Sequence, residues 1–429
     1  MLKMFVALAV SSGSLWAQVA GSSVNTDIQQ SASETTESPN PVIEWNKTLL
    51  VIVRTNGAQS PTIHSTRNFA MLHVAMYDAI NGIDAVFSPY LVRMSSVPHG
   101  ASERAAADQA AHDVLVALYP AFQSTLDAQL QEDFAQIADG QEKTDGLAIG
   151  ATVAAEIVAF RSKDGADVIP PKYKPGTAPG DYQLTPPNFA PADFTQWPAV
   201  TPFALARADE FRPAPPPQLN SEEYVSAFDE VKSIGIAGST TRTAEQTTIG
   251  KFWNGNIQDF WNEIAQTAAA AHHLNLLESA RLFAWLNISL ADTTIGVFDA
   301  KYTYNFWRPV TAIRLAGQDH DPKTQPDPTW LPLSTKTAPD PSYPGAHSAI
   351  SFAGAEVLKA YFGDHFTFDI TSESLAGVTR HFNSFSAAAE EAGLSRIYAG
   401  QHFRTDHEGG KLLGKQIGES VIDTMFRPR

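Results

Sequence analysis

The chain has 429 residues, a formal net charge of −16 and no cysteine. Because it has no thiol, it can form no disulfide, thiolate metal site or cysteine nucleophile. Its acidic balance argues against nucleic acid and anionic membrane surfaces as partners, since like charges repel.

The N-terminus reads as an export signal followed by a leader. Residues 1–20 combine one lysine, an apolar run and small residues near Ala17 and Ala20, which predicts a signal peptide. Residues 21–41 are rich in Ser, Thr, Asn and Gln and predict a disordered leader. No later stretch is apolar for long enough to span a bilayer. We therefore expect a secreted or periplasmic protein with no membrane span in the mature chain.

Apolar residues recur at helical spacing along most of the remaining chain. The segments with this spacing are 68–83, 102–137 with a break near Pro120, 144–160 and 243–298. Roughly 390 residues remain after the leader, enough for one large core or two fused halves. The pattern predicts an all-α protein, a large helical bundle with an N-terminal helical part at 42–242 and a C-terminal one at 243–429.

Proline dominates residues 164–219, which are too many for an ordinary connection between helices. The aromatic residues within this segment favour a packed loop over a free tether. We expect the loop to wrap the bundle and to shape the entrance of a pocket. These aromatic residues include Tyr173, Tyr182, Phe189, Phe194, Trp197 and Phe203.

Two short motifs in the C-terminal part carry cations and small residues. In KYTYNFWRP, Lys301 and Arg308 are seven apart, a spacing that places both on one helical face. In PSYPGAHSAISFAG, Pro344, Gly345 and Ala346 lead into a helix that is expected to start near His347 or Ser348. The free amides of such a helix start can bind an anion.

The third motif, AGLSRIYAGQHFRTDHEGG, reads as a single helix. Ser395 and His402 then lie two turns apart, with Asp406 one turn beyond. Arg396 could hold an oxyanion, and His402 could attack or ligate its central atom. Asp406 could set the imidazole tautomer, while Ser395 could bond only locally. Three cations, a helix start and two histidines together describe a site for a tetrahedral oxyanion.

The three motifs, K-x6-RP, P-x-Y-P-x-x-H-S and S-R-x5-H-x3-D, resemble the signature of type 2 phosphatidic acid phosphatases and vanadium-dependent haloperoxidases. WRP in the first motif and YP in the second are closer to the haloperoxidase branch. EWNKTLLVIVR and RNFAMLHVAMYDAINGI resemble the N-terminal part of its bacterial members. The resemblance covers most of the chain from about Val42. It implies two helical bundles side by side, often assembled into homo-oligomers.

The haloperoxidase resemblance implies a vanadate cofactor with His402 as its only protein ligand. It also implies that Lys301 polarises bound peroxide for attack by halide, which releases hypohalous acid, and that His347 is the acid–base residue. An organic acceptor would consume the product. The groups expected to neutralise the vanadate oxygens are Lys301, Arg308, Arg396 and the amides of Gly345 and Ala346.

Two other functions remain open at this stage. As an acid phosphatase of the same superfamily, the chain would need no cofactor and would act on phosphate esters. His402 would then form a phosphohistidine, and His347 would protonate the leaving alkoxide and activate water. A non-catalytic binder on the same fold is the third alternative.

Two positions depart from the haloperoxidase pattern. Gly345 and Ala346 replace the usual Ser-Gly, and loss of the hydroxyl removes a hydrogen bond of about 1–2 kcal/mol to the anion. Asp340 stands where the fungal chloride-oxidising enzymes place an aromatic residue near the halide. We expect this carboxylate to disfavour chloride, which leaves bromide or iodide.

Upstream, Asp292 could pair with a site arginine or be exposed.

Overall fold

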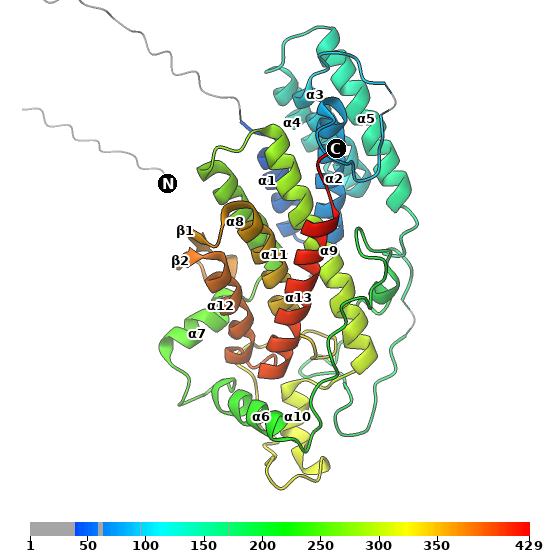
Figure 1. The fold of residues 1–429 in the computed structure, drawn as a ribbon. Helices are drawn as coiled ribbons and strands as arrows, with labels where there is room; N and C mark the ends of the chain where they lie inside the picture. The colour runs from blue at the N-terminus through cyan, green and yellow to red at the C-terminus, as the bar shows by residue number, and fades with distance from the viewer. Residues whose placement is uncertain (1–38, 59–62, 95, 171) are drawn as a thin grey trace, which may run out of the picture. The chain divides into compact units, whose positions relative to one another are not determined.

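The computed structural model describes residues 39–58, 63–94, 96–170 and 172–429 (Figure 1). The predicted signal peptide and all of the predicted leader before residue 39 lie outside these ranges. The described chain is helical apart from loops and one small hairpin, so the all-α prediction is confirmed. No helix in these ranges is both long and apolar enough to cross a membrane.

The first group of helices packs around α3. Its members are α1 (Pro41–Arg54), α2 (His64–Asp84), α3 (Glu103–Leu118), α4 (Gln123–Phe134) and α5 (Gln141–Arg161). The side chain of Ser102 caps α3, and a 3-10 turn at Pro120 separates α3 from α4, as the break in the pattern predicted. Helix α5 crosses α3 so closely that a Cβ on Gly150 would lie 2.4 Å from the Ala106 carbonyl oxygen.

The C-terminal helices pack against one another, with α11 in contact with α8, α9, α12 and α13. They are α6 (Glu222–Ile234), α7 (Ala244–Phe252), α8 (Ile257–Ala271), α9 (Leu276–Tyr304), α10 (Pro309–Leu315), α11 (Ala346–Phe362), α12 (Phe385–Tyr398) and α13 (Arg404–Thr424). Strands β1 (His365–Thr371) and β2 (Thr379–Ser384) form an antiparallel hairpin that pairs Phe368 with Phe382.

Helix α9 joins the two groups. It starts with a capping box between Asn275 and Glu278 and is buried along almost its whole length. It packs against α2 of the first group and against α11 and α13 of the second, near the middle of the molecule in Figure 1. Its C-terminal turn, which carries Lys301, is therefore held from several sides.

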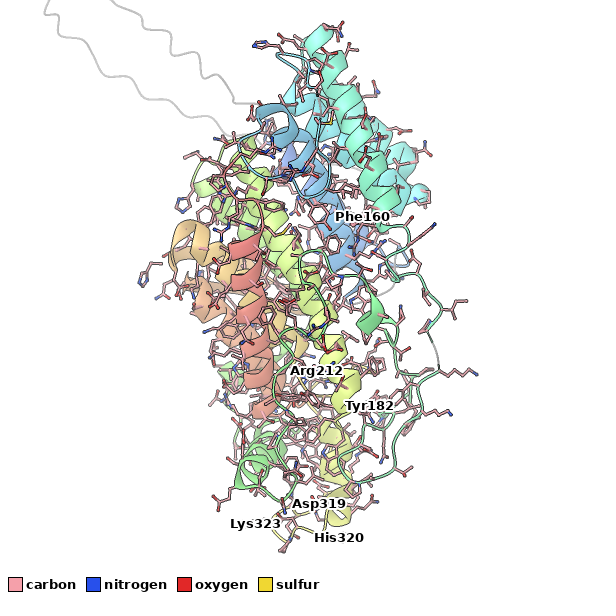
Figure 2. All side chains as sticks on the ribbon, turned by 45° about the vertical axis from the view of Figure 1, so that its right-hand side comes forward. Phe160, Tyr182, Arg212, Asp319, His320 and Lys323 are labelled. Atoms are coloured by element: carbon pink, nitrogen blue, oxygen red, sulfur yellow. The ribbon has the colours of Figure 1, made fainter. Side chains whose placement is uncertain are left out.

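The proline-rich segment packs along α9, as the sequence predicted. Tyr182, Phe194, Trp197 and Phe203 are buried, whereas Phe189 is exposed. The Tyr182 amide donates to the Asn305 carbonyl at 2.7 Å, and Arg212 pairs with Asp299 of α9 (Figure 2).

Asp292 anchors the same segment to the middle of α9. Its fully buried carboxylate accepts the backbone N–H groups of Phe203, Ala204 and Leu205 at 2.6–2.9 Å. The expectation that Asp292 pairs with a site arginine or is exposed was therefore wrong, because a strand-like stretch 87 to 89 residues earlier supplies its partners.

Candidate active site

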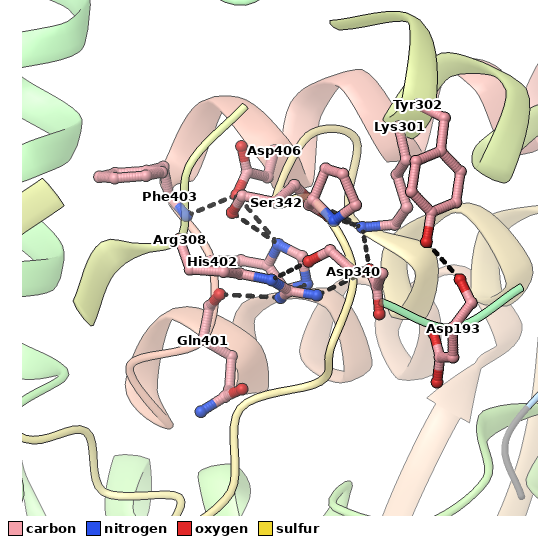
Figure 3. A network of polar contacts seen from close by, with 11 residues as sticks. Asp193, Lys301, Tyr302, Arg308, Asp340, Ser342, Gln401, His402, Phe403 and Asp406 are labelled. Carbon is pink, nitrogen blue, oxygen red and sulfur yellow. Dashed lines mark hydrogen bonds and ion pairs between the residues drawn. The ribbon is translucent and has the colours of Figure 1, made fainter. Parts of the chain in front are cut away.

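The three motifs meet at one end of the C-terminal group (Figure 3). Lys301 lies in the last turn of α9, and Arg308 is the residue that precedes α10. His347 lies in the first turn of α11, and Arg396 lies in the last turn of α12. His402 stands in the short connection between α12 and α13.

Lys301 and Arg308 do not share a helix, contrary to the expectation. Helix α9 ends at Tyr304, and Asn305 takes a left-handed conformation with φ of 54°. Pro309 restricts Arg308 to an extended conformation and opens α10. The two cations therefore converge because the chain turns between them, not because of helical spacing.

The third motif is also not one helix. Helix α12 ends at Tyr398, and Gly400 turns the chain with φ of 76°, a conformation that glycine adopts without strain. His402 thus sits in an extended connection, and Asp406 lies in the first turn of α13. Ser395 donates its hydroxyl to the Ala392 carbonyl within its own helix, the local bond that the sequence left open.

Asp406 orients the imidazole of His402. Its Oδ2 lies 2.9 Å from His402 Nδ1 and also accepts the Phe403 amide and the Ser342 hydroxyl. Because a carboxylate accepts, Nδ1 carries the proton and the Nε2 lone pair points the other way. There it accepts from Arg308 Nη1 at 3.0 Å. Burial, reinforced by Arg308 and Lys301, holds the pKa of His402 well below its usual value, so the ring is neutral.

Lys301 and Arg308 share one carboxylate oxygen. Lys301 Nζ and Arg308 Nη2 each lie 2.8 Å from Oδ1 of Asp340, and all three side chains are buried (Figure 3). Burial lowers the pKa of Lys301 to about 8 although Asp340 opposes this shift. Burial alone would raise the pKa of Asp340, but the two cations hold it below its ordinary value. Asp340 is therefore ionised.

Arg396 retains donor capacity. Its Nη1 donates to Asn254 Oδ1 at 3.1 Å, and its Nε is buried with no hydrogen-bond partner. Burial, with Arg308 nearby, lowers the pKa of Arg396 to about 10, which leaves the guanidinium charged near neutral pH. An unpartnered buried N–H of a cation fits a bound oxyanion, which would accept from it.

The start of α11 differs from the expectation at one residue. The helix begins at Ala346, one or two residues before the predicted start at His347 or Ser348, and the Ala346 amide has no partner within the helix. The Gly345 amide donates to the Asp406 carbonyl at 2.8 Å, so it is not free for an anion. His347 Nε2 lies 3.1 Å from the Trp253 carbonyl and donates to it. Burial, together with the charge of Arg396, holds the pKa of His347 well below its usual value.

Three contributors to the site carried no signal in the sequence. Ser342 supports Asp406, Asn254 supports Arg396 and the Trp253 carbonyl fixes His347. Residues 253 and 254 lie between α7 and α8, and Trp253 is 94 residues before His347, the nearer of the two site residues that they contact. Only the tertiary structure brings them to the site.

A cavity of about 1190 Å³ opens from these residues. Lys301, Arg308, Asp340, His347, Arg396 and His402 line its inner end. Thr185, Pro186, Pro187 and Asn188 of the proline-rich segment line it further out, in agreement with the expected role of that segment. The end of α1 and the start of α8 complete the wall.

The donor set fits vanadate better than a free metal cation. Among the described residues no group of three His, Cys, Asp or Glu side chains could chelate a metal ion. The inner cavity instead offers one imidazole nitrogen, three cations, the Ala346 amide and the unpartnered Arg396 Nε. One nitrogen ligand amid many N–H donors suits the central atom and oxygens of an oxyanion.

Known proteins are similar to this chain in sequence and in fold. A family model described as the VCPO second helical-bundle domain matches residues 281–428. Vanadium chloroperoxidase of Curvularia inaequalis is 25% identical over 270 residues, which cover 47% of this chain and 44% of that protein. The chain thus spans about half the length of this curated relative.

Solved structures extend the similarity over most of the chain. A bacterial vanadium-dependent iodoperoxidase has a TM-score of 0.74 and 25% identity, with 90% of this chain and 95% of that chain covered. A bacterial vanadium-dependent chloroperoxidase shares the fold with a TM-score of 0.66 at 16% identity, over 86% and 94% of the two chains. Residues 281–428 therefore match the helical-bundle family of vanadium chloroperoxidases, and most of the chain is similar in fold to bacterial vanadium-dependent haloperoxidases.

Proposed function

We propose that this chain is a vanadate-dependent haloperoxidase that oxidises bromide or iodide with hydrogen peroxide to the hypohalous acid. The observation that carries the proposal is the arrangement of His402. Asp406 accepts a hydrogen bond from its Nδ1–H, so the proton stays on Nδ1 and Nε2 is one neutral nitrogen ligand beside Arg308 in a buried cationic pocket. Relatives named vanadium chloroperoxidase and vanadium-dependent iodoperoxidase support the same class of activity.

The residues of the chain divide the work between binding and charge neutralisation. His402 Nε2 would ligate vanadate, which when bound supplies Lewis-acid activation of peroxide. Arg396 and the Ala346 amide would donate to its oxygens from the side of α11 and α12. Lys301 and Arg308 would donate from the side of α9 and α10, after a change of partner at Asp340.

His347 would accept the proton of incoming hydrogen peroxide. The depressed pKa of His347 keeps its imidazole neutral near neutral pH, and a neutral imidazole is a base. A bound anion would offset the charge of Arg396 and so raise this pKa. The shift brings the group toward the range in which it can both take and return a proton.

The preference for bromide or iodide rests on Asp340. Its ionised carboxylate lines the inner cavity, where a halide must approach. Negative charge there disfavours the approach of every halide. We expect the effect on the reaction to be largest for chloride, because chloride is the hardest of the three to oxidise. The phosphatase interpretation uses the same cationic cradle, formed by Lys301, Arg308 and Arg396. It predicts that vanadate inhibits the enzyme, whereas the haloperoxidase proposal predicts that vanadate activates it.

A paired assay on the purified apoprotein separates these functions. Bromide and iodide oxidation by hydrogen peroxide and hydrolysis of p-nitrophenyl phosphate are followed with and without orthovanadate. We expect vanadate to switch on halide oxidation. Phosphate ester hydrolysis that vanadate only inhibits would establish the phosphatase instead. Binding of vanadate without either activity would establish the non-catalytic binder.

Matched histidine variants locate the activity. We expect His402→Ala to abolish vanadate-dependent halide oxidation, because it removes the imidazole nitrogen that contacts Arg308. His381→Ala removes a largely exposed histidine of β2 that pairs with Asp369, and it should keep full activity. Equal activity of the two variants would refute the role given to His402.

A further inference from the structure

Lys301 has no free donor in the structure. An ammonium group has three N–H bonds. Those of Lys301 go to the Pro341 carbonyl, to the Ser342 carbonyl at 3.1 Å and to Asp340 Oδ1 at 2.8 Å. Before Lys301 can donate to a bound oxyanion, one of these partners must be given up.

Arg308 is nearly saturated in the same way. Its Nε donates to the Asp340 carbonyl at 2.8 Å and its Nη2 to Asp340 Oδ1 at 2.8 Å. Its Nη1 donates to the Gln401 carbonyl at 3.1 Å and to His402 Nε2 at 3.0 Å. Four of the five N–H bonds of the guanidinium are thus in use. Lys301 and Arg308 share one partner, the Asp340 carboxylate, and it is an anion.

The charges of the pocket nearly cancel. Three cations, Lys301, Arg308 and Arg396, face the buried carboxylates of Asp340 and Asp406, which leaves one net positive charge when the two histidines are neutral. Burial, and to a lesser extent the charge of Asp340, raises the pKa of the Asp193 carboxyl to about 8. Near neutral pH this carboxyl is therefore mostly protonated and adds little charge to the pocket. The pocket therefore matches an anion of charge −1.

We propose that Asp340 is a selectivity residue that competes with the bound anion for Lys301 and Arg308 and thereby favours singly charged tetrahedral oxyanions over doubly charged ones. This inference rests on the proposed function, since it assumes that the cradle binds an oxyanion. Orthovanadate is mainly singly charged near neutral pH, whereas tungstate and phosphate monoesters are mainly doubly charged. Asp340 thus favours vanadate over phosphate monoesters, although the surrounding cations could bind either anion.

The physical reason is the short range of the contact. A doubly charged anion that enters beside Lys301 and Arg308 must either face the Asp340 carboxylate across a few ångströms or displace it from both cations. In a buried pocket neither water nor salt screens this repulsion, so each added unit of charge on the anion raises the cost of binding.

The test is calorimetric titration of the full chain with orthovanadate and with tungstate, each alone, near neutral pH. In Asp340→Asn we expect the ratio of the tungstate to the vanadate dissociation constant to fall at least about tenfold. Asp340→Glu keeps the charge, and it should keep the ratio of the wild-type protein. A ratio that stays within about twofold in Asp340→Asn overturns the proposal.

Glu263→Gln is the matched control. Glu263 lines the same cavity but pairs with Arg54, away from Lys301 and Arg308. This variant removes a carboxylate from the cavity without touching Lys301, Arg308 or Arg396, so it should leave the ratio unchanged. An equal effect of the two variants would mean that total charge decides, which also overturns the proposal.

Thermal unfolding of each variant, checked before titration, shows that it is folded. A folded wild-type chain that binds neither anion refutes the proposal. The proposed function has its own test: it is wrong if vanadate binds but no halide is oxidised. In that case the ratio of the tungstate to the vanadate dissociation constant still tests the role of Asp340.

Discussion

At the scale of single residues, Asp406 links the start of a helix to the orientation of the candidate ligand. Its Oδ2 accepts the Phe403 amide at the beginning of α13 and the Nδ1 proton of His402. Burial raises the pKa of Asp406 to about 6, against the effect of Ser342 and of the backbone donor. Near neutral pH the group is ionised, and an ionised carboxylate holds one tautomer of the imidazole.

We predict that Asp406→Asn weakens orthovanadate binding by about 10–100-fold. The amide can still accept the Phe403 N–H through its oxygen, but it can also donate to Nδ1, which releases the tautomer of His402. Calorimetric titration with orthovanadate measures the change. Ser395→Ala, whose lost hydroxyl bonds only within α12, should bind as the wild-type chain does. Unchanged binding in Asp406→Asn would contradict the orienting role.

At the scale of elements, the contact between α11 and α13 determines how His347 and Asp406 face each other. The two helices approach so closely that a Cβ on Gly414 would lie 2.0 Å from the Ala349 carbonyl oxygen. One turn further along α13, a Cβ on Gly418 would lie 3.1 Å from the Ala353 carbonyl oxygen. The spacing is therefore tight toward the site and looser away from it.

We predict that Gly414→Ala lowers the free energy of unfolding by about 1–3 kcal/mol, because backbone atoms must move to admit the methyl group. The same shift separates α13 from α11, so orthovanadate binding should weaken as well. Gly418→Ala is the matched control and should cost less, since alanine favours helix by up to about 1 kcal/mol over glycine. Urea midpoints of both variants give the comparison. Equal losses would show that the crossing is not tighter at Gly414.

At the scale of the whole molecule, the proline-rich segment connects the two helical groups and lines the cavity. One end is held where Asp164 pairs with Arg67 and Arg161. Asp292 holds the stretch 203–205 against α9. Between them, residues 185–188 and Ala190 line the cavity, while Ile169 remains 91% exposed. The segment is thus fixed at discrete points and exposed between them.

We predict that Asp292→Ala makes the backbone near 203–205 susceptible to protease, because three buried N–H groups lose their acceptor. In the wild-type chain, cleavage should concentrate near Val168 and Ile169, which are exposed. Limited proteolysis followed by mass spectrometry of the fragments distinguishes the two patterns. Asp209→Ala, which removes an exposed carboxylate of the same segment, should give the wild-type fragments. Identical maps for Asp292→Ala would refute the anchoring role.

Much of the architecture was accessible from the sequence because it depends on local pattern. Apolar periodicity predicted the helices α2 to α5 and α7 to α9 but not α6, and the small residues before His347 placed the start of α11 to within two residues. The aromatic content of 164–219 predicted a packed loop, since buried aromatic surface can offset the entropy of ordering.

The sequence by itself determined the helical class and the residue types of the candidate site, because three motifs fix the kind and spacing of cations and histidines. The tertiary structure alone decided how they converge. Turns at Asn305 and Gly400, not helix faces, bring the motifs together, and the Gly345 amide is taken by Asp406. The carboxylate of Asp340 lies between Lys301 and Arg308, a contact across about 39 residues that no local spacing encodes.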